Sequence, residues 1–170
     1  MSALAHEPAV ILIIDNDPIM LTGIAAVLNM SGYECHCARN AQAARKAIKS
    51  LALDLIVCDV DLGPENGLEL CRELRQLPGI EDVPMMFISA AQAPDIVRRS
   101  HDAGGSYYLR KPFDPEVLIE LVSKALWMPH LVQSRVAAMP EPIAEPAPAT
   151  PVVPRSNLRH ALSGIRMPMA

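Results

Sequence analysis

The stretch Asp54-Leu55-Ile56-Val57-Cys58-Asp59-Val60-Asp61 decides how this 170-residue chain is expected to fold. It is a short apolar run with β-branched members that ends abruptly in carboxylates, and a segment containing Gly and Pro follows it at 63–67. Such a run is typical of a strand that is buried on both faces of a parallel sheet. Asp59 would therefore lie at the carboxyl end of a central strand, which is where open α/β sheets bind their ligands.

Further apolar runs and helical patterns alternate on both sides of this strand. We expect strands at 10–14, 33–38, 54–59, 85–89 and 107–109, and helices at 18–29, 40–51, 67–77, 95–103 and 114–127. Asp17, Asn40 and Asp114 are expected to cap helices, and Pro18 and Pro115 suit the first helical position. Five strands that alternate with five helices predict an α/β fold, a doubly wound parallel sheet with helices on both faces.

Composition divides the chain into an N-terminal extension at 1–8, a folded domain at 9–128 and a tail at 129–170. The tail is rich in Pro and Ala, a composition that cannot form a packed core, so we expect it to be largely disordered. Residues 157–165 have the apolar spacing of a short helix. The tail is too short and irregular for a helix-turn-helix DNA reader.

Charge and cysteine usage exclude several classes of function. Residues 1–128 hold 11 Lys/Arg against 17 Asp/Glu, so the chain has no strong basic patch and we expect no direct DNA binding. No apolar run approaches the roughly 20 residues of a membrane span, and no signal peptide pattern is visible. The four cysteines lack metal-type spacing, which indicates reduced thiols in a cytoplasmic protein.

Chemically useful side chains follow four of the expected strands. Asp15, Asn16 and Asp17 follow the first strand, Asp59 ends the third, Ser89 ends the fourth and Lys111 follows the fifth. The carboxyl ends of parallel strands share one edge of the sheet, so these groups should meet there. Clustered carboxylates repel one another unless a cation lies among them, and Mg²⁺ prefers a few carboxylates plus waters. A metal, a lysine and a hydroxyl around one carboxylate can support phosphoryl transfer.

The same residues resemble a known family. The segments Ile11-Leu12-Ile13-Ile14-Asp15-Asn16-Asp17-Pro18, Asp54 to Asp59 with Gly67 eight residues later, Phe87-Ile88-Ser89-Ala90 and Lys111-Pro112-Phe113 look like the receiver domain of two-component response regulators. The resemblance covers about residues 9–127, with the motifs in the right order and spacing. It implies a flavodoxin-like sheet with the strand order 2-1-3-4-5.

The resemblance also implies a role for each matching residue. Asp59 would accept a phosphoryl group from a phosphohistidine on a sensor histidine kinase or a histidine phosphotransfer protein. Asp15, Asn16, Asp59 and the backbone carbonyl of Asp61 would hold Mg²⁺. Ser89 would be the hydroxyl that moves toward the phosphoryl group, and Lys111, with a cis bond to Pro112, would contact it.

Tyr108 matches the aromatic position that swings inward in this family as the hydroxyl moves. The swing alters the face formed by helix four, strand five and helix five, through which such domains bind a downstream protein or form dimers. The chain would thus be a signalling protein and not an enzyme. Its signal would pass through altered protein–protein binding.

One residue departs from the family pattern. The second acid of the metal-binding pair is Asn16, whose amide oxygen can still coordinate Mg²⁺ but brings no negative charge. Both metal affinity and the rate of phosphorylation would fall. A phosphate-independent adaptor with a receiver fold is therefore an alternative.

A second alternative comes from another class, the haloacid-dehalogenase-type phosphatases. These enzymes also use an Asp at a strand end with a second Asp two residues later, as in Asp59 and Asp61. Their further acidic motif follows the lysine, however, whereas here the acids of the set precede Asp59 and only Asp114 and Glu116 follow Lys111. The order of the motifs favours the receiver.

Overall fold

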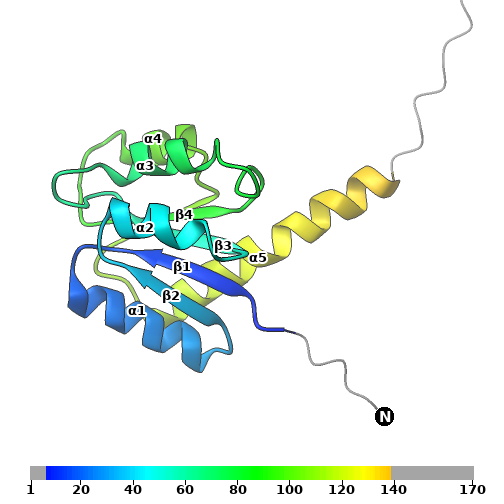
Figure 1. The fold of residues 1–170 in the computed structure, drawn as a ribbon, viewed down its shortest axis with the longest axis horizontal. Coiled ribbons are helices and arrows are strands. Elements are labelled where there is room, and N and C mark those ends of the chain that lie inside the picture. Colours follow the sequence, from blue (N-terminus) through cyan, green and yellow to red (C-terminus); the bar gives the residue numbers. More distant parts are fainter. Residues whose placement is uncertain (1–6, 139–170) are drawn as a thin grey trace, which may run out of the picture. The chain divides into compact units, whose positions relative to one another are not determined.

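The chain folds into one five-stranded parallel sheet between two layers of helices, as a computed structural model shows for residues 7–138 (Figure 1). The strands are β1 (Val10–Ile14), β2 (Glu34–Ala38), β3 (Leu55–Asp59), β4 (Met85–Ser89) and β5 (Tyr107–Arg110). Their order in the sheet is β2-β1-β3-β4-β5, and every neighbouring pair is parallel. The expected fold class and strand order are confirmed.

The helices alternate with the strands as the sequence predicts. They are α1 (Pro18–Met30), α2 (Ala41–Ile48), α3 (Gly67–Leu74), α4 (Ile96–Asp102) and α5 (Pro115–Ala138). Two predicted caps form as expected, since the side chain of Asp17 accepts from Ile19 N and Met20 N, and that of Asn40 accepts from Ala43 N. Each cap satisfies backbone N–H groups that the first turn of a helix leaves without a partner.

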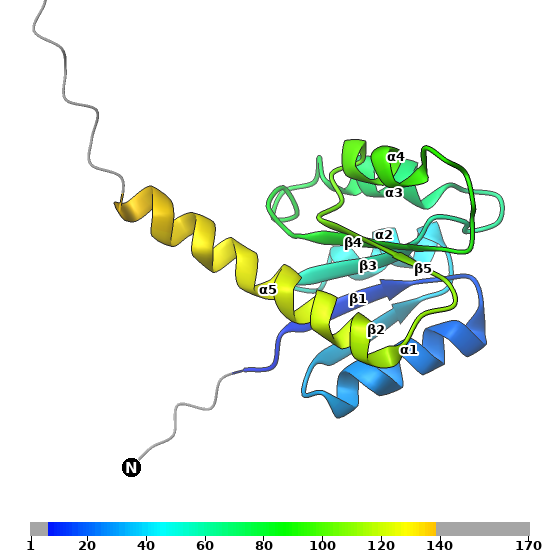
Figure 2. The same ribbon diagram turned by 180° about the vertical axis from the view of Figure 1, so that it is seen from behind.

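Two hydrophobic cores lie on the two faces of the sheet, because alternate residues of a strand point to opposite faces. The helices α2, α3 and α4 cover one face and bury residues such as Ala44, Leu68 and Ile96. The helices α1 and α5 cover the other face and bury residues such as Ile24 and Val122. Figures 1 and 2 show the two layers from opposite sides. All five residues of β3 and of β4 are buried, as expected for central parallel strands.

The last helix is longer than predicted. We expected α5 to end near Trp127, before Pro129, but it continues through that proline to Ala138 and extends beyond the sheet (Figure 2). A proline removes one backbone hydrogen bond and usually ends a helix. Here good helix formers such as Leu, Gln, Arg and Ala surround it, and they favour continuation. The boundary that we predict between 128 and 129 thus falls inside a helix.

Two helices are shorter than predicted, and the structure does not describe the two ends of the chain. The second and third helices end earlier than predicted, at Ile48 and Leu74. Residues 1–6 and 139–170 lie outside the described part of the chain, so the predicted tail and its short helix at 157–165 stay predictions. Within the described part, no helix has the length and apolar character needed to cross a membrane.

Candidate functional site

The predicted site residues gather at the carboxyl edge of the sheet. Asp15 directly follows β1, Asp59 and Ser89 are the last residues of β3 and β4, and Lys111 directly follows β5. Asp15, Asp59 and Ser89 are all buried, with 1%, 7% and 0% of their surface exposed. Buried ionisable groups need partners because burial without one is costly.

Lys111 supplies that partner for both carboxylates. Its Nζ donates hydrogen bonds to Asp15 Oδ2 at 2.8 Å and to Asp59 Oδ2 at 2.9 Å. Burial by itself lowers the pKa of Lys111, but the bonds to the two carboxylates outweigh it and the pKa is raised. Lys111 is therefore a fixed positive charge beside Asp59.

Asp59 is held from two further directions. The backbone N–H of Asp61 donates to Asp59 Oδ1 at 3.2 Å. Gly67, at the start of α3, packs so closely that a β-carbon there would lie 1.9 Å from the carbonyl oxygen of Asp59, so only glycine fits. Burial raises the pKa of the Asp59 carboxyl, and the hydrogen bond from Lys111 opposes this rise only in part.

Asp15, Asn16 and Asp17, the three residues after β1, make different contacts. Asp15 accepts from the backbone N–H of Asp17 at 2.8 Å in addition to its bond with Lys111. Asp17 serves as the N-cap of α1. Asn16 is exposed, and its amide lies beside the loop after β3, where a β-carbon on Gly63 would come 3.5 Å from its Nδ2.

These residues fit a magnesium ion in the type of their donor atoms. In the described part of the chain no group of three or more His, Cys, Asp or Glu is arranged to hold a metal. The predicted set has only two buried carboxylates, Asp15 and Asp59, and adds an amide oxygen and a backbone carbonyl from Asn16 and Asp61. An oxygen-only set with few protein ligands is what Mg²⁺ accepts, because it keeps several waters.

The residues with a predicted switch role lie on β4 and β5. Ser89 Oγ accepts from the backbone N–H of Ala91 at 3.0 Å. Tyr108 packs against the core under α2, α3 and α4, and Tyr107 packs against the opposite core, so the two tyrosines lie on opposite faces of the sheet. The Tyr108 hydroxyl is buried without a hydrogen-bond partner among the described residues. The Lys111–Pro112 bond is cis, as expected.

The sequence analysis did not predict two sets of contacts that hold the loop after β3. Asn66 caps α3 by accepting from Leu68 N and Glu69 N, and the pattern of Asn66 followed three residues later by Glu69 is a detectable capping signal. Arg45 on α2 binds both Glu65 and Glu73, each through an Nη2 contact of 2.8 Å. These carboxylates lie 20 and 28 residues away in the chain, so no local pattern marks the contact.

Comparisons with known proteins agree with this geometry. Residues 11–123 match the family model described as response regulator receiver domain. The phosphate regulon transcriptional regulatory protein PhoB of Pseudomonas aeruginosa is 34% identical over 116 residues, which are 68% of this chain and 51% of PhoB. The DNA-binding dual master transcriptional regulator RpaA of Synechocystis is 32% identical over 68% of this chain and 48% of its own.

A solved structure gives the same result. A putative response regulator from Chloroflexus aurantiacus is 31% identical, with a TM-score of 0.66 over 70% of this chain and 98% of that one. The chain spans about half the length of the two curated relatives.

Proposed function

The chain belongs to the family of response regulator receiver domains, and from this premise we propose that Asp59 accepts a phosphoryl group from a phosphohistidine. The observation that carries the proposal is the contact of one lysine, Lys111, with both Asp15 and Asp59 at the carboxyl edge of the sheet. This arrangement places a fixed cation beside a buried carboxylate.

In the proposed reaction an oxygen of the Asp59 carboxylate attacks phosphorus. A P–O bond forms, the P–N bond of the phosphohistidine breaks, and its electron pair returns to the imidazole. Lys111 stabilises the charge on the phosphoryl oxygens, and the hydroxyl of Ser89, one residue beyond the Ile88 that pairs with Asp59 in the sheet, donates to one of them. Bound Mg²⁺, held by Asp15, Asn16, Asp59 and the Asp61 carbonyl, would neutralise further oxygen charge.

The phosphoryl donor is a sensor histidine kinase or a histidine phosphotransfer protein in this proposal, and an apolar groove beside the site supports a protein donor. Ile19, Met20 and Phe113 line this groove between α1 and the loop before α5, with Asp17 at its rim. Ile19 is 83% exposed, and large apolar side chains exposed next to a polar site favour protein docking.

Output passes, we propose, through the face of α4, β5 and α5 to a downstream protein or to a second copy of the chain. Val97 on α4 and Val117 on α5 are 58% and 42% exposed. Phosphorylation would draw the Ser89 hydroxyl toward Asp59 and shift the population of this face. The role that we assign is signalling through protein binding in the cytoplasm. It involves neither turnover of a substrate nor direct contact with DNA.

The phosphatase alternative is disfavoured by the position of the second acid. The Asp61 side chain is exposed, and its Oδ1 accepts from Gly63 N at 3.0 Å. It therefore serves the turn after β3, whereas a phosphatase would need this carboxyl as a proton donor beside Asp59.

Intact mass after incubation with phosphoramidate and Mg²⁺ tests the proposal, since this donor carries the same P–N bond as phosphohistidine. We expect one phosphoryl adduct on the wild type and none on Asp59→Ala. Asn16→Asp adds a negative charge near the metal and should raise Mg²⁺ affinity about tenfold. An unlabelled wild type and an unlabelled Asn16→Asp variant would establish the phosphate-independent adaptor instead.

A further inference from the structure

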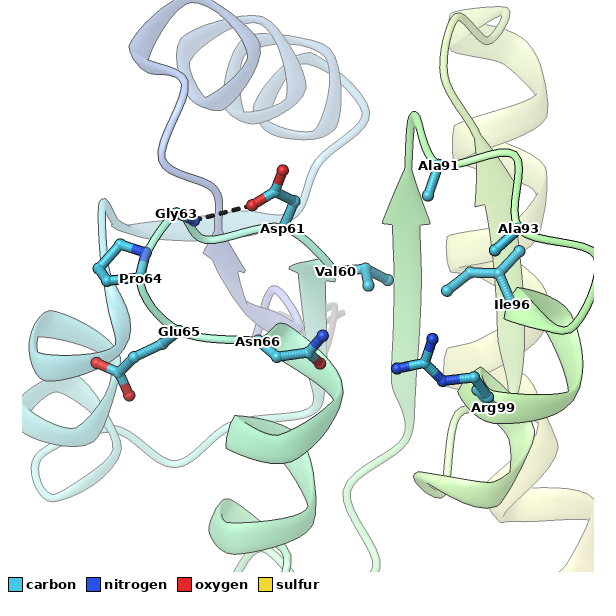
Figure 3. A pocket seen from close by; sticks show the side chains of 10 residues that line it. All are labelled: Val60, Asp61, Gly63, Pro64, Glu65, Asn66, Ala91, Ala93, Ile96 and Arg99. Carbon is cyan, nitrogen blue, oxygen red and sulfur yellow. Dashed lines mark hydrogen bonds between the residues drawn. The ribbon is translucent and has the colours of Figure 1, made fainter.

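A second pocket lies between the loop after β3, which follows Asp59 in the chain, and helix α4 (Figure 3). Its volume is about 330 Å³, at the lower end of the range of small-molecule sites. The loop after β3 supplies Val60 and Asn66, the segment after β4 supplies Ala91 and Ala93, and α4 supplies Ile96 and Arg99. Most of these lining side chains are apolar.

The acidic groups at this pocket are turned away or already paired. Asp61 accepts from the N–H of Gly63, and Figure 3 shows its carboxylate on the far side of the loop from Arg99. Glu65 points outward in the same view and is bound to Arg45. Neither carboxylate is therefore available to a molecule inside the pocket.

The groups that do face the pocket are hydrogen-bond donors. The Arg99 guanidinium points in from α4 toward Asn66 (Figure 3), and no side-chain hydrogen bond or ion pair is found for it among the side chains described, residues 7–127. The Asn66 Oδ1 is occupied by Leu68 N and Glu69 N, which fixes the amide so that its Nδ2 is free to donate. Arg99 and Asn66 thus present hydrogen-bond donors to a pocket that is also lined by Val60, Ala93 and Ile96.

Arg75 is an arginine whose guanidinium is held by backbone carbonyls. It donates to the carbonyls of Glu81 and Gly104, each at 2.8 Å. Arg45 is likewise committed to Glu65 and Glu73. Arg99 differs from both in having its guanidinium free at the mouth of a cavity.

We propose that this pocket binds a small organic monocarboxylate, a molecule with one carboxylate on a compact apolar body. A guanidinium presents parallel N–H groups that match a carboxylate, and the Asn66 amide adds a further donor. Val60, Ala93 and Ile96 would cover the apolar body. Asp61 and Glu65 still add negative charge near the pocket although their carboxylates are turned away or paired, so a singly charged ligand is favoured over a dianion such as phosphate.

Such a ligand would connect two parts of the molecule that the proposed function requires to move relative to each other. One wall belongs to the loop that follows Asp59, and the other belongs to the segment that follows Ser89. If Asp59 is phosphorylated as we propose, the ligand and the phosphoryl group would alter each other's binding reciprocally. Binding does not require phosphorylation, so it can be tested on the unphosphorylated chain.

The test is an amide ¹H–¹⁵N NMR titration of the unphosphorylated full chain with phenylacetate, with phenylacetamide as the neutral analogue. We expect saturable shifts confined to the amides of Val60, Asn66, Ala93 and Ile96. Phenylacetamide should bind at least about tenfold more weakly, because it lacks the charge that strengthens the bonds to Arg99.

Arg99→Gln should weaken phenylacetate binding by about tenfold or more, because a hydrogen bond between charged partners is lost. Arg98→Gln is the matched control, since Arg98 is also exposed on α4 but does not line the pocket, and it should bind like the wild type. Arg99 is exposed, so both variants are expected to fold.

Shifts that do not saturate, that spread over other surfaces or that persist unchanged in Arg99→Gln would overturn the proposal. Because the titration needs no phosphoryl donor, its failure is distinguishable from a failure of Asp59 to accept phosphate.

Discussion

Two loops lie beside Asp59, the proposed phosphoacceptor, and they are built differently. The β3–α3 loop, residues 60–66, is closed by the bond from Gly67 N to Val60 O at 2.8 Å and by the bond from Leu62 N to Glu65 O. Arg45 ties it to α2 from outside. The next helix begins with a formed cap at Asn66.

The β4–α4 loop, residues 90–95, has far fewer supports. Its bonds within the described chain are Ala91 N to Ser89 Oγ, Ile96 N to Ala93 O and Arg99 N to Asp95 O. Asp95, which we predicted to begin α4, stands at the N-cap position, but its side chain makes no capping bond. Few hydrogen bonds and short elements mark regions that open at low free-energy cost. The β3–α3 loop is therefore the more firmly held of the two, and the β4–α4 loop should move at the lower free-energy cost.

The largest effect should come from Gly67→Ala, which tests the fixed side of this comparison. The new β-carbon would meet the Asp59 carbonyl at 1.9 Å, so the start of α3 must shift. We expect a loss of about 3 kcal/mol in the free energy of unfolding, measured with urea.

Gly23→Ala is the control for this substitution. Gly23 lies within α1 with nothing within 4 Å of its added β-carbon, so alanine should stabilise by about 0.5–1 kcal/mol. Equal losses in both variants would show that the close contact at Asp59 does not exist.

Removing the two caps compares the loops directly. Asn66→Ala loses an oxygen that accepts from two backbone N–H groups and should cost about 1 kcal/mol of unfolding free energy. Asp95→Ala loses no capping bond and should change stability by no more than about 0.5 kcal/mol. A larger loss for Asp95→Ala would reverse our assignment of the fixed and mobile loops.

The pH dependence of the free energy of unfolding should reveal what it costs to keep the buried Asp59 carboxyl ionised. Burial raises its pKa above the ordinary 3.8, so the folded chain binds more protons than the unfolded chain just above that pH. Stability is therefore lost as pH rises through the raised pKa. Asp59→Asn should unfold at a higher temperature than the wild type at pH 7.

The advantage of Asp59→Asn should shrink as the pH falls toward 3.8, where the wild-type carboxyl becomes protonated in both states. Thermal unfolding followed by circular dichroism at several pH values measures this difference. An advantage that stays constant with pH would contradict the assigned burial effect.

The smallest effect is expected from Arg45→Met. Its two ion pairs are partly exposed, and such pairs contribute roughly 0.2–1 kcal/mol. We expect a loss of about 0.5 kcal/mol at low ionic strength that decreases in about 1 M NaCl, where charges are screened.

Arg72→Met on α3 is the control for Arg45→Met, because Arg72 is exposed and no side-chain partner is found for it among residues 7–127. Its stability should match the wild type in both salts. If Arg45→Met lowered the free energy of unfolding equally in both salts, the packing of the aliphatic part of Arg45, and not its charge, would account for the loss.

The extent to which sequence predicted the site follows from the range of the interactions involved. Asp15, Asp59 and Lys111 were found because each stands beside an apolar run, and the topology of a parallel sheet brings such positions to one edge. The caps Asp17 and Asn40 were found because a cap acts within its own turn. Pro129 was misjudged because its local preference was overridden within a longer helix.

The sequence by itself determined the sheet, its two helical layers and the residues at its carboxyl edge. These features depend on hydrophobic periodicity and on hydrogen bonds between residues close in the sequence. Both can be inferred from short segments of the chain. The tertiary structure alone decided that Lys111 would bind two carboxylates at once, that Gly67 would be pressed against the Asp59 carbonyl, and that Arg99 would have no partner beside a pocket. Those contacts join residues distant in the chain, and their distances exist only once the helices have packed on the sheet.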